Sequence, residues 1–133
     1  MEHINILLVD DEEDFITTLS ERLSLRGFKT DTAFDGEAAL HFLDKNEVDI
    51  VVLDLKMPGM TGMEVLRKIR ENNQRVMIII QTGHGTDKEE EETAQLGVSS
   101  FLRKPVDIEG LITCLKDAAA SLQNEDEEER EKS

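Results

Sequence analysis

The stretch VVLDLKMPGMTG, from Val51 to Gly62, shows which kind of fold the chain adopts. It opens with Val and Leu residues in unbroken succession, as in a strand that is buried on both faces. The run nevertheless ends on a carboxylate, Asp54, before a loop that contains Pro58 and Gly59. A buried charge is costly unless it is paired or binds something. Asp54 is therefore either the cap of a turn or the centre of a site.

The composition indicates one acidic globular domain. A chain of 133 residues fits a single domain with a normal core. Its net charge of -15 repels nucleic acid and anionic membranes, so we expect no direct binding to either. A single cysteine, Cys114, excludes an internal disulfide and a multi-cysteine metal site. No segment has the length and apolarity of a membrane span, and the N-terminus lacks a signal-peptide pattern, so we expect a cytoplasmic protein.

Short apolar runs alternate with helix-like segments along the chain. Residues 4–9, 49–54 and 76–80 are almost continuous Val, Ile and Leu, which predicts strands covered on both faces. Residues 28–33 alternate between polar and apolar and suit an edge strand, and residues 98–102 supply a fifth run. Five successive strand–helix units predict a parallel sheet with right-handed crossovers and a helix layer on each face.

The segments between the runs carry apolar residues at helical spacing. The stripes are Phe15, Ile16, Leu19 and Leu23; Ala38, Ala39, Phe42 and Leu43; Val65, Leu66 and Ile69; and Ile108, Leu111, Ile112, Leu115 and Ala119. The segment Thr86–Gly97 offers only Ala94 and Leu96 as clear apolar contacts, so we expect the fourth helix to be the least firmly packed. We place the domain at residues 1–122 and interpret residues 123–133 as an acidic tail, either disordered or the frayed end of the last helix.

Polar residues lie at the carboxyl ends of the predicted strands. In an open parallel α/β sheet, ligands bind beyond the carboxyl ends of the strands. DDEED, residues 10–14, follows the first run, and Asp54 ends the third. Thr82 follows the fourth run, and Lys104 precedes Pro105 after the fifth. Each could have an ordinary role, such as a helix cap, a turn cap or a surface lysine, yet all of them converge on one edge of the sheet.

A shared site explains this convergence chemically. Asp10, Asp11 and Asp54 bring three carboxylates together, which raise each other's pKa unless a cation intervenes. Oxygen ligands without His or Cys favour Mg²⁺, or a similar hard cation such as Mn²⁺. The ammonium of Lys104 and the hydroxyl of Thr82 suit the equatorial oxygens of a phosphoryl group. A central carboxylate can act as the nucleophile and form an aspartyl phosphate, so we predict that Asp54 is the phosphoacceptor.

Together, LLVDDEEDF, VVLDLKMPGMTGMEVLRKIR, IIIQTGHG and FLRKP resemble the receiver domain of two-component response regulators, in its single-domain, CheY-like form. The resemblance covers residues 4–120. It implies a flavodoxin-like (βα)₅ three-layer sandwich whose five-stranded parallel sheet has the order 2-1-3-4-5. The implied function is phosphorelay signal transduction. The domain is then not an enzyme in the ordinary sense, because it catalyses only its own phosphorylation and slow autodephosphorylation.

The resemblance also implies a role for each residue of the metal site. Asp11 is the direct Mg²⁺ ligand, and Asp10 acts mainly through water. Asp54 is both a metal ligand and the phosphorylation site. The backbone carbonyl of Lys56 completes the protein ligands. Lys56 and His84 occupy rim positions that tend to tune the lifetime of the phosphoryl group, which the sequence leaves open.

A second set of roles concerns the phosphoryl group and the switch. Thr82 and Lys104 contact the phosphoryl oxygens, and Phe101 occupies the position of the switch aromatic. The Lys104–Pro105 bond is a candidate cis peptide. Gly83 stands where many receivers have Ala, so we expect a more open pocket.

The implied phosphodonor is a sensor histidine kinase or a histidine phosphotransfer protein. Signalling is expected on the face formed by the fourth helix, fifth strand and fifth helix, through which a dimer would form or a downstream protein or output domain would be controlled. The sequence names neither the kinase nor the target, and the fourth helix is more acidic than usual for the family.

Two other functions fit these residues less well. A Mg²⁺-dependent phosphohydrolase that forms an aspartyl phosphate commonly carries a second Asp two residues after the nucleophile, where this chain has Lys56. It would also need a cap domain to select its substrate, and none is evident. A degenerate receiver that serves only for docking would not need the complete set of acidic and basic residues.

Overall fold

The computed structural model describes residues 4–73 and 75–132, and their side chains as far as residue 124. Strands and helices alternate strictly along the chain. The strands are β1 (Asn5–Val9), β2 (Lys29–Ala33), β3 (Ile50–Leu53), β4 (Met77–Thr82) and β5 (Ser100–Arg103). The helices are α1 (Glu13–Leu25), α2 (Gly36–Lys45), α3 (Gly62–Asn72), α4 (Asp87–Gln95) and α5 (Ile108–Lys132).

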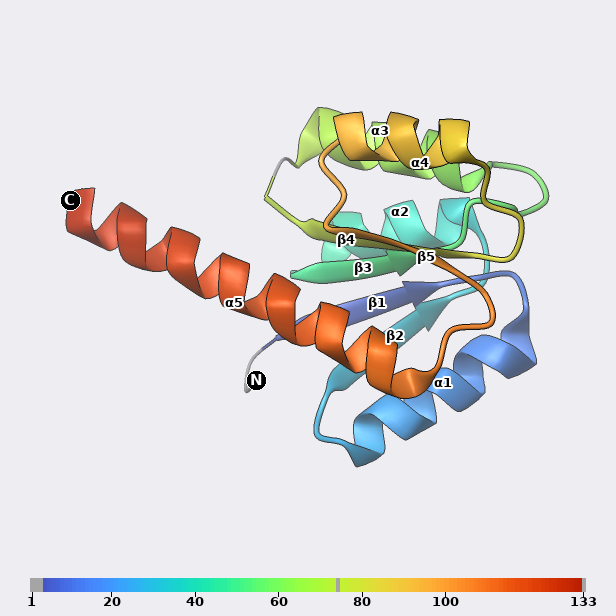
Figure 1. Ribbon diagram of the computed structural model, residues 1–133, viewed down its shortest axis with the longest axis horizontal. Coiled ribbons are helices and arrows are strands. Elements are labelled where there is room, and N and C mark those ends of the chain that lie inside the picture. Colours follow the sequence, from blue (N-terminus) through green and yellow to red (C-terminus); the bar gives the residue numbers. More distant parts are fainter. Residues whose placement is uncertain (1–3, 74, 133) are drawn as a thin grey trace.

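All strand pairs are parallel, and the sheet has the order β2-β1-β3-β4-β5. Helices α1 and α5 cover one face, and α2, α3 and α4 lie on the other (Figure 1). This is the predicted three-layer (βα)₅ architecture, and the predicted strand order is confirmed.

Alternate residues of each central strand enter different cores, because successive side chains of a strand point to opposite faces. In β1, Ile6 and Leu8 pack with the helices α1 and α5, whereas Leu7 and Val9 pack with α2 and α3. The central strands are buried on both faces for this reason, which explains their unbroken Val, Ile and Leu content.

The ends of one strand and one helix differ from the sequence prediction. The strand β4 continues through Gln81 and Thr82, beyond the predicted end at Ile80, because these residues pair with Leu102 and Arg103 of β5. Backbone hydrogen bonding extends the strand here, although the side chains of Gln81 and Thr82 are polar. The helix α5 has helical backbone through Lys132 and projects well beyond the sheet (Figure 1). The domain boundary at residue 122 stays a prediction.

Three predicted core contacts are wrong: Phe15, Ala38 and Ala94 are exposed. Phe15 shares the apolar stripe of α1, but its side chain is 38% exposed, whereas Ile16 and Leu23 are buried. Ala94 of α4 is exposed, and the buried residue of this helix is Thr93. As expected, α4 contributes little to the core. No helix in the described part of the chain is long and apolar enough to cross a membrane.

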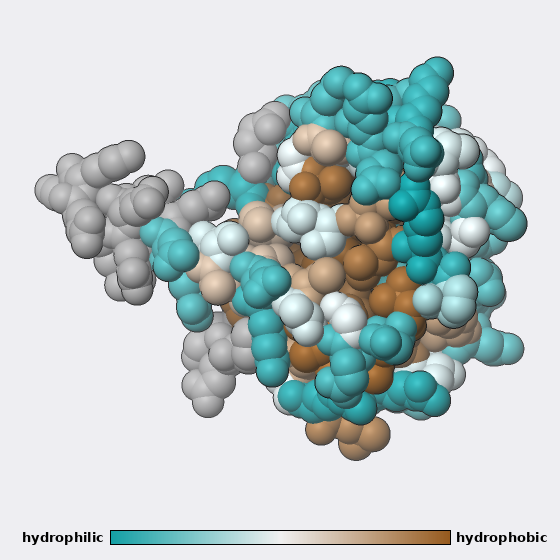
Figure 2. All heavy atoms as spheres, viewed as in Figure 1, coloured by the Kyte–Doolittle hydropathy of each residue, from teal (hydrophilic) through white to brown (hydrophobic). Residues whose placement is uncertain are grey.

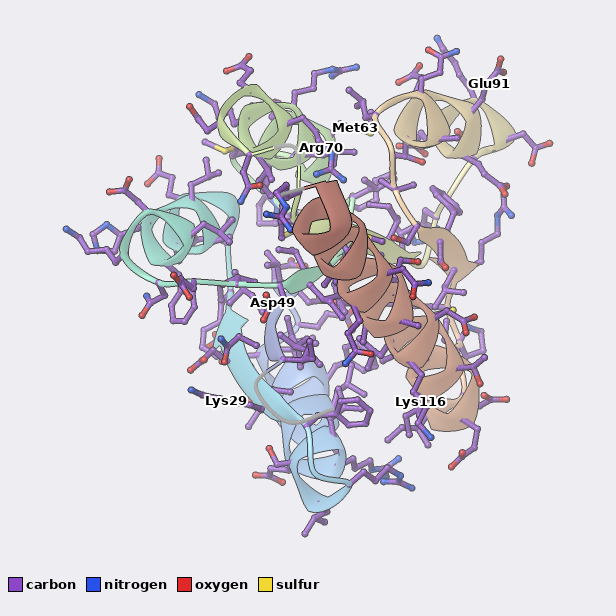
Figure 3. The ribbon with its side chains drawn as sticks, turned by 90° about the vertical axis from the view of Figure 1, so that its left-hand side faces the viewer. Lys29, Asp49, Met63, Arg70, Glu91 and Lys116 are labelled. Atoms are coloured by element: carbon purple, nitrogen blue, oxygen red, sulfur yellow. The ribbon has the colours of Figure 1, made fainter. Side chains whose placement is uncertain are left out.

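A cavity of about 1110 Å³ lies at the amino-terminal edge of the sheet, between the ends of α2 and α3 and the side chain of Leu122. Asp49, which lines it, is seen at this edge in Figure 3. The carboxylate of Asp49 already has a partner, because it accepts a hydrogen bond from the backbone N–H of Asn5 at 2.8 Å. This cavity is therefore remote from the residues that the sequence singled out, which lie at the opposite edge.

Candidate phosphoacceptor site

Backbone pairing beyond the ends of β1 and β3 positions the two buried carboxylates. The N–H of Asp10 donates to the carbonyl of Ala33 at 3.1 Å, and the N–H of Asp54 donates to that of Val9 at 3.0 Å. Each aspartate thus stays in register for one residue past its strand. Both side chains are almost fully buried, at 2% exposure for Asp10 and 4% for Asp54.

Asp10, Asp11 and Asp54 form a carboxylate cluster. One oxygen from each lies within 4.8 Å of the others, and Asp11 is the most accessible of the three. Asp10 Oδ1 accepts a hydrogen bond from the N–H of Glu12 at 2.9 Å, and Asp54 Oδ1 accepts one from that of Lys56 at 3.3 Å. An oxygen-only set of this kind fits a hard divalent cation such as Mg²⁺.

Lys104 brings the only ammonium that the described residues place against this cluster. Its Nζ lies 2.7 Å from Asp10 Oδ2, 3.1 Å from Glu12 Oε1 and 3.9 Å from Asp54 Oδ2. The backbone supports this placement, because the N–H of Lys104 donates to the carbonyl of Thr82 at 2.8 Å. The Lys104–Pro105 peptide is cis, which confirms that prediction.

Burial and charge have opposite effects on the pKa values of Asp10 and Lys104. Burial raises the pKa of Asp10 and outweighs the hydrogen bonds from Lys104 and from the Glu12 backbone, and the charge of Asp54 adds to the rise. Burial alone would lower the pKa of Lys104, but its hydrogen bonds to Asp10 and Glu12 prevail, and its pKa is raised. The site therefore holds a firmly protonated ammonium beside the Asp10 carboxylate, whose charged form is disfavoured by burial.

Thr82 is fully buried at the end of β4, with 0% exposure. Its hydroxyl Oγ1 has no hydrogen-bond partner within the described residues, although buried polar groups are normally paired. An unpaired hydroxyl at the carboxyl edge is available to donate to a ligand oxygen. This observation supports a phosphoryl group at the site.

Gly85 lies against both Thr82 and Phe101, which the sequence did not predict. A Cβ placed on Gly85 would come within 2.7 Å of the Phe101 ring and 2.9 Å of Thr82 Cγ2. The ring and the threonine methyl group therefore both border a position that only a glycine leaves free. The guanidinium of Arg103 lies over the Phe101 ring, 5.1 Å from its centre. The glycines around Thr82 in the sequence were a signal, but they did not identify which one mattered.

Gly62 was also missed as a site residue. A Cβ at this position would lie 2.1 Å from the backbone oxygen of Asp54 and 2.5 Å from the Cα of Leu55. The first turn of α3 therefore packs directly on the backbone just after β3. The N–H of Gly62 donates to the carbonyl of Leu55 at 3.0 Å and fixes this approach.

The rim of the site is polar and partly open. Lys56 extends away from the cluster and pairs with Glu89 of α4, with Nζ 2.9 Å from Oε2. This hydrogen bond is the main reason that the pKa of Glu89 is lowered. His84 and Gly83 are exposed, and a Cβ on Gly83 would meet only Lys104 Cδ, at 4.0 Å. The space beside Gly83 agrees with the expected open pocket.

The chain matches the family described as the response regulator receiver domain over residues 6–116. Sporulation initiation phosphotransferase F of Bacillus subtilis is 33% identical over 84% of this chain and 90% of the relative. The transcriptional regulatory protein GlrR of Escherichia coli is 37% identical over 86% of this chain. The chain spans only 26% of the length of GlrR, whose remaining part has no counterpart in the match.

Solved structures agree with this assignment. A CheY-like receiver domain protein from Methanospirillum hungatei superposes with a TM-score of 0.88 over 92% of this chain and 98% of that one, at 22% identity, which shows the fold alone. A response regulator receiver domain from Clostridium thermocellum gives a TM-score of 0.84 over 90% and 97% of the two chains, at 30% identity. The chain belongs to the response regulator receiver family, and it is a signalling domain of two-component systems.

Proposed function

We propose that this receiver domain accepts a phosphoryl group on Asp54 and signals through the resulting change of conformation. One observation carries the proposal: Lys104 Nζ stands 3.9 Å from Asp54 Oδ2 inside a cluster of three carboxylates. A buried carboxylate nucleophile, ligands for a cation and an ammonium are the groups that phosphoryl transfer to an aspartate requires. The unpaired hydroxyl of Thr82 supports the same chemistry.

Asp10, Asp11, Asp54 and the backbone carbonyl of Lys56 would hold Mg²⁺ or Mn²⁺. The cation, when bound, neutralises charge on the cluster and on the phosphoryl oxygens. The residues of this chain then divide the remaining work. Asp54 supplies the attacking oxygen, while Lys104 and Thr82 donate to the phosphoryl oxygens. Lys104 Nζ now pairs with Asp10 Oδ2. A cation held by Asp10 would compete with this pair, which would allow Nζ to move toward Asp54.

The test is intact-mass measurement after incubation with acetyl phosphate. Wild type should gain one phosphoryl group when Mg²⁺ is present and none without it. Asp54→Asn should gain none, and Asp11→Ala should be labelled far more slowly at the same Mg²⁺ concentration. Equal labelling of Asp54→Asn and wild type would show that the acceptor is another residue.

We further propose that phosphorylation moves Thr82 toward the phosphoryl oxygens by a charge-assisted hydrogen bond and frees the Phe101 ring to turn inward. The closeness of both side chains to Gly85 supports this coupling. The phosphoryl group must bind the active conformation more tightly than the inactive one, so the change is a shift of population.

The proposed donor is the phosphohistidine of a sensor kinase or of a phosphotransfer protein in the cytoplasm. The domain would catalyse only its own phosphorylation and slow autodephosphorylation. Signalling, or dimer formation, is assigned to the face of α4, β5 and α5. Hydrophobic residues gather across the middle of this face, with hydrophilic residues on either side of them (Figure 2). Such a pattern, an apolar centre with a polar rim, is typical of protein–protein interfaces.

A further inference from the structure

Phe15 has an unusual place for an aromatic residue on an apolar helix stripe. Its neighbours on α1, Ile16, Leu19 and Leu23, enter the core beneath the helix. Phe15 instead remains 38% exposed, and the Nζ of Lys104 lies 4.6 Å from the centre of its ring. The ring therefore contacts the reactive site and contributes little to the core.

The ammonium of Lys104 is enclosed from two directions. Carboxylate oxygens of Asp10, Glu12 and Asp54 lie 2.7, 3.1 and 3.9 Å away. The Phe15 ring supplies the remaining contact. The face of an aromatic ring attracts a cation through its quadrupole, and it does so without adding a negative charge to a cluster that already holds three carboxylates.

Holding the ammonium matters because a lysine side chain is long and flexible, so its charge can occupy many positions. The carboxylate of Glu12, 64% exposed, offers Nζ a partner at the rim of the site. The Phe15 ring gives Nζ a further contact while it remains close to Asp10 and Asp54.

We propose that Phe15 is a positioning residue for phosphoryl transfer, which holds Lys104 Nζ where it meets the phosphoryl oxygens. The inference rests on the proposed roles of Asp54 and Lys104. With acetyl phosphate as donor, a carboxylate oxygen of Asp54 forms a bond to phosphorus as the bond from phosphorus to the acetate oxygen breaks. Acetate leaves with the electron pair. Phe15 takes no part in bond making and acts through the lysine.

The experiment compares variants of Phe15 in the rate of labelling by acetyl phosphate with saturating Mg²⁺. Phe15→Leu should lower kcat about two- to fivefold, the range expected for an exposed cation–π contact, with KM little changed. Phe15→Tyr keeps the ring face and should retain the wild-type rate. Phe34→Leu is the matched control, because Phe34 is similarly exposed, at 37%, and the described residues place no cation over its ring.

A second measurement reports the contact directly. The NMR shifts of the Lys104 CεH₂ group should lose their ring-current contribution in Phe15→Leu and keep it in Phe15→Tyr. Should Phe15→Leu melt too early for use, Phe15→Met serves in the same comparison.

The outcomes separate the two proposals. Wild-type kcat in Phe15→Leu, with wild type labelled on Asp54, would overturn the role of Phe15 and leave the proposed function intact. A loss in Phe15→Tyr equal to that in Phe15→Leu would show that the ring face is not what holds the lysine. Absence of labelling on Asp54 in wild type would overturn the proposed function, and the role of Phe15 with it.

Discussion

Helices α1 and α4 are attached to the same sheet by different physical means. Leu23 of α1 has 0% exposure and Ile16 has 2%, so this helix is held by buried apolar area. The helix α4 buries only Thr93 and has no apolar face comparable to that of α1. Apolar burial is non-directional and persists as long as the helix stays docked. The attachment of α4 must come from other contacts.

Charged and polar groups anchor α4 at both ends. At its N-terminal end, Lys56 pairs with Glu89 at 2.9 Å, and Arg103 pairs with Asp87 and Glu90 at 3.1 and 2.9 Å. Apart from the more buried Glu89, these groups are half-exposed or fully exposed, and such pairs exchange for water at little cost in free energy. The N-terminal end of α4, next to the site, can therefore move with little loss of stability.

The C-terminal end of α4 is anchored more firmly, by the buried guanidinium of Arg70. Its nitrogens donate to the carbonyls of Leu96, Gly97 and Val76 at 2.8, 3.1 and 2.7 Å. Figure 3 shows Arg70 reaching from α3 into the region between α3 and α4. The comparison teaches that α1 serves as scaffold, while α4 is fixed at one end and easily released at the other.

The largest expected effect is in α1. Leu23→Ala removes a fully buried side chain and should lower the free energy of unfolding by about 2–5 kcal/mol, measured by urea denaturation. Leu96→Ala, at the end of α4, is the matched change at a partly buried leucine and should cost less than half as much. Equal losses at the two positions would contradict the contrast between the helices.

Arg70→Met should have the next largest effect on stability. It keeps an apolar stem but leaves backbone carbonyls at the end of α4 without their charged donor, which should cost roughly 2–3 kcal/mol. Hydrogen exchange of α4 and of the loop after it should accelerate more than that of α1. If exchange rises equally in both helices, Arg70 does not anchor α4 specifically.

Thr82→Ala tests whether the site reaches α4. The variant should still bind beryllofluoride, a phosphoryl mimic, at Asp54, but the NMR shifts of residues 87–96 and Phe101 seen in wild type should largely vanish. This corresponds to losing a coupling of roughly 1–3 kcal/mol. Gly83→Ala is the control, because the structure leaves room for its methyl group. A full set of distant shifts in Thr82→Ala would exclude it as the coupling residue.

The smallest effect is expected for the pair at the N-terminal end of α4. Lys56→Met removes the partner of Glu89 but keeps the helix cap, in which Glu89 Oε1 accepts from the N–H of Thr86 at 3.1 Å. Loss of one partly exposed ion pair should lower stability by only about 0.2–1 kcal/mol. The difference from wild type should shrink further in high salt, because salt screens such pairs. A loss as large as that of Arg70→Met would mean that this end is anchored as firmly as the other.

The sequence by itself determined the fold and the edge at which the chemistry gathers. Continuous apolar runs between helical stripes require a parallel sheet covered on both faces, and parallel strands bring their carboxyl ends to one edge. Asp10 follows one run directly, Asp54 ends another, and Lys104 lies two residues after the fifth, so their meeting follows from topology. The structure places them together, with Lys104 Nζ 2.7 Å from Asp10 Oδ2.

Only the tertiary structure decided which neighbours surround that site. Phe15 belongs to an apolar stripe, yet it lies over Lys104, which is far from it in the sequence. Gly85 accommodates the Phe101 ring, and Glu89 of α4 pairs with Lys56 of the loop after β3. Periodicity assigns a residue to a face of its own helix, but it carries no information on which distant side chain meets it there. That depends on how the helices pack on the sheet, which many weak contacts set together.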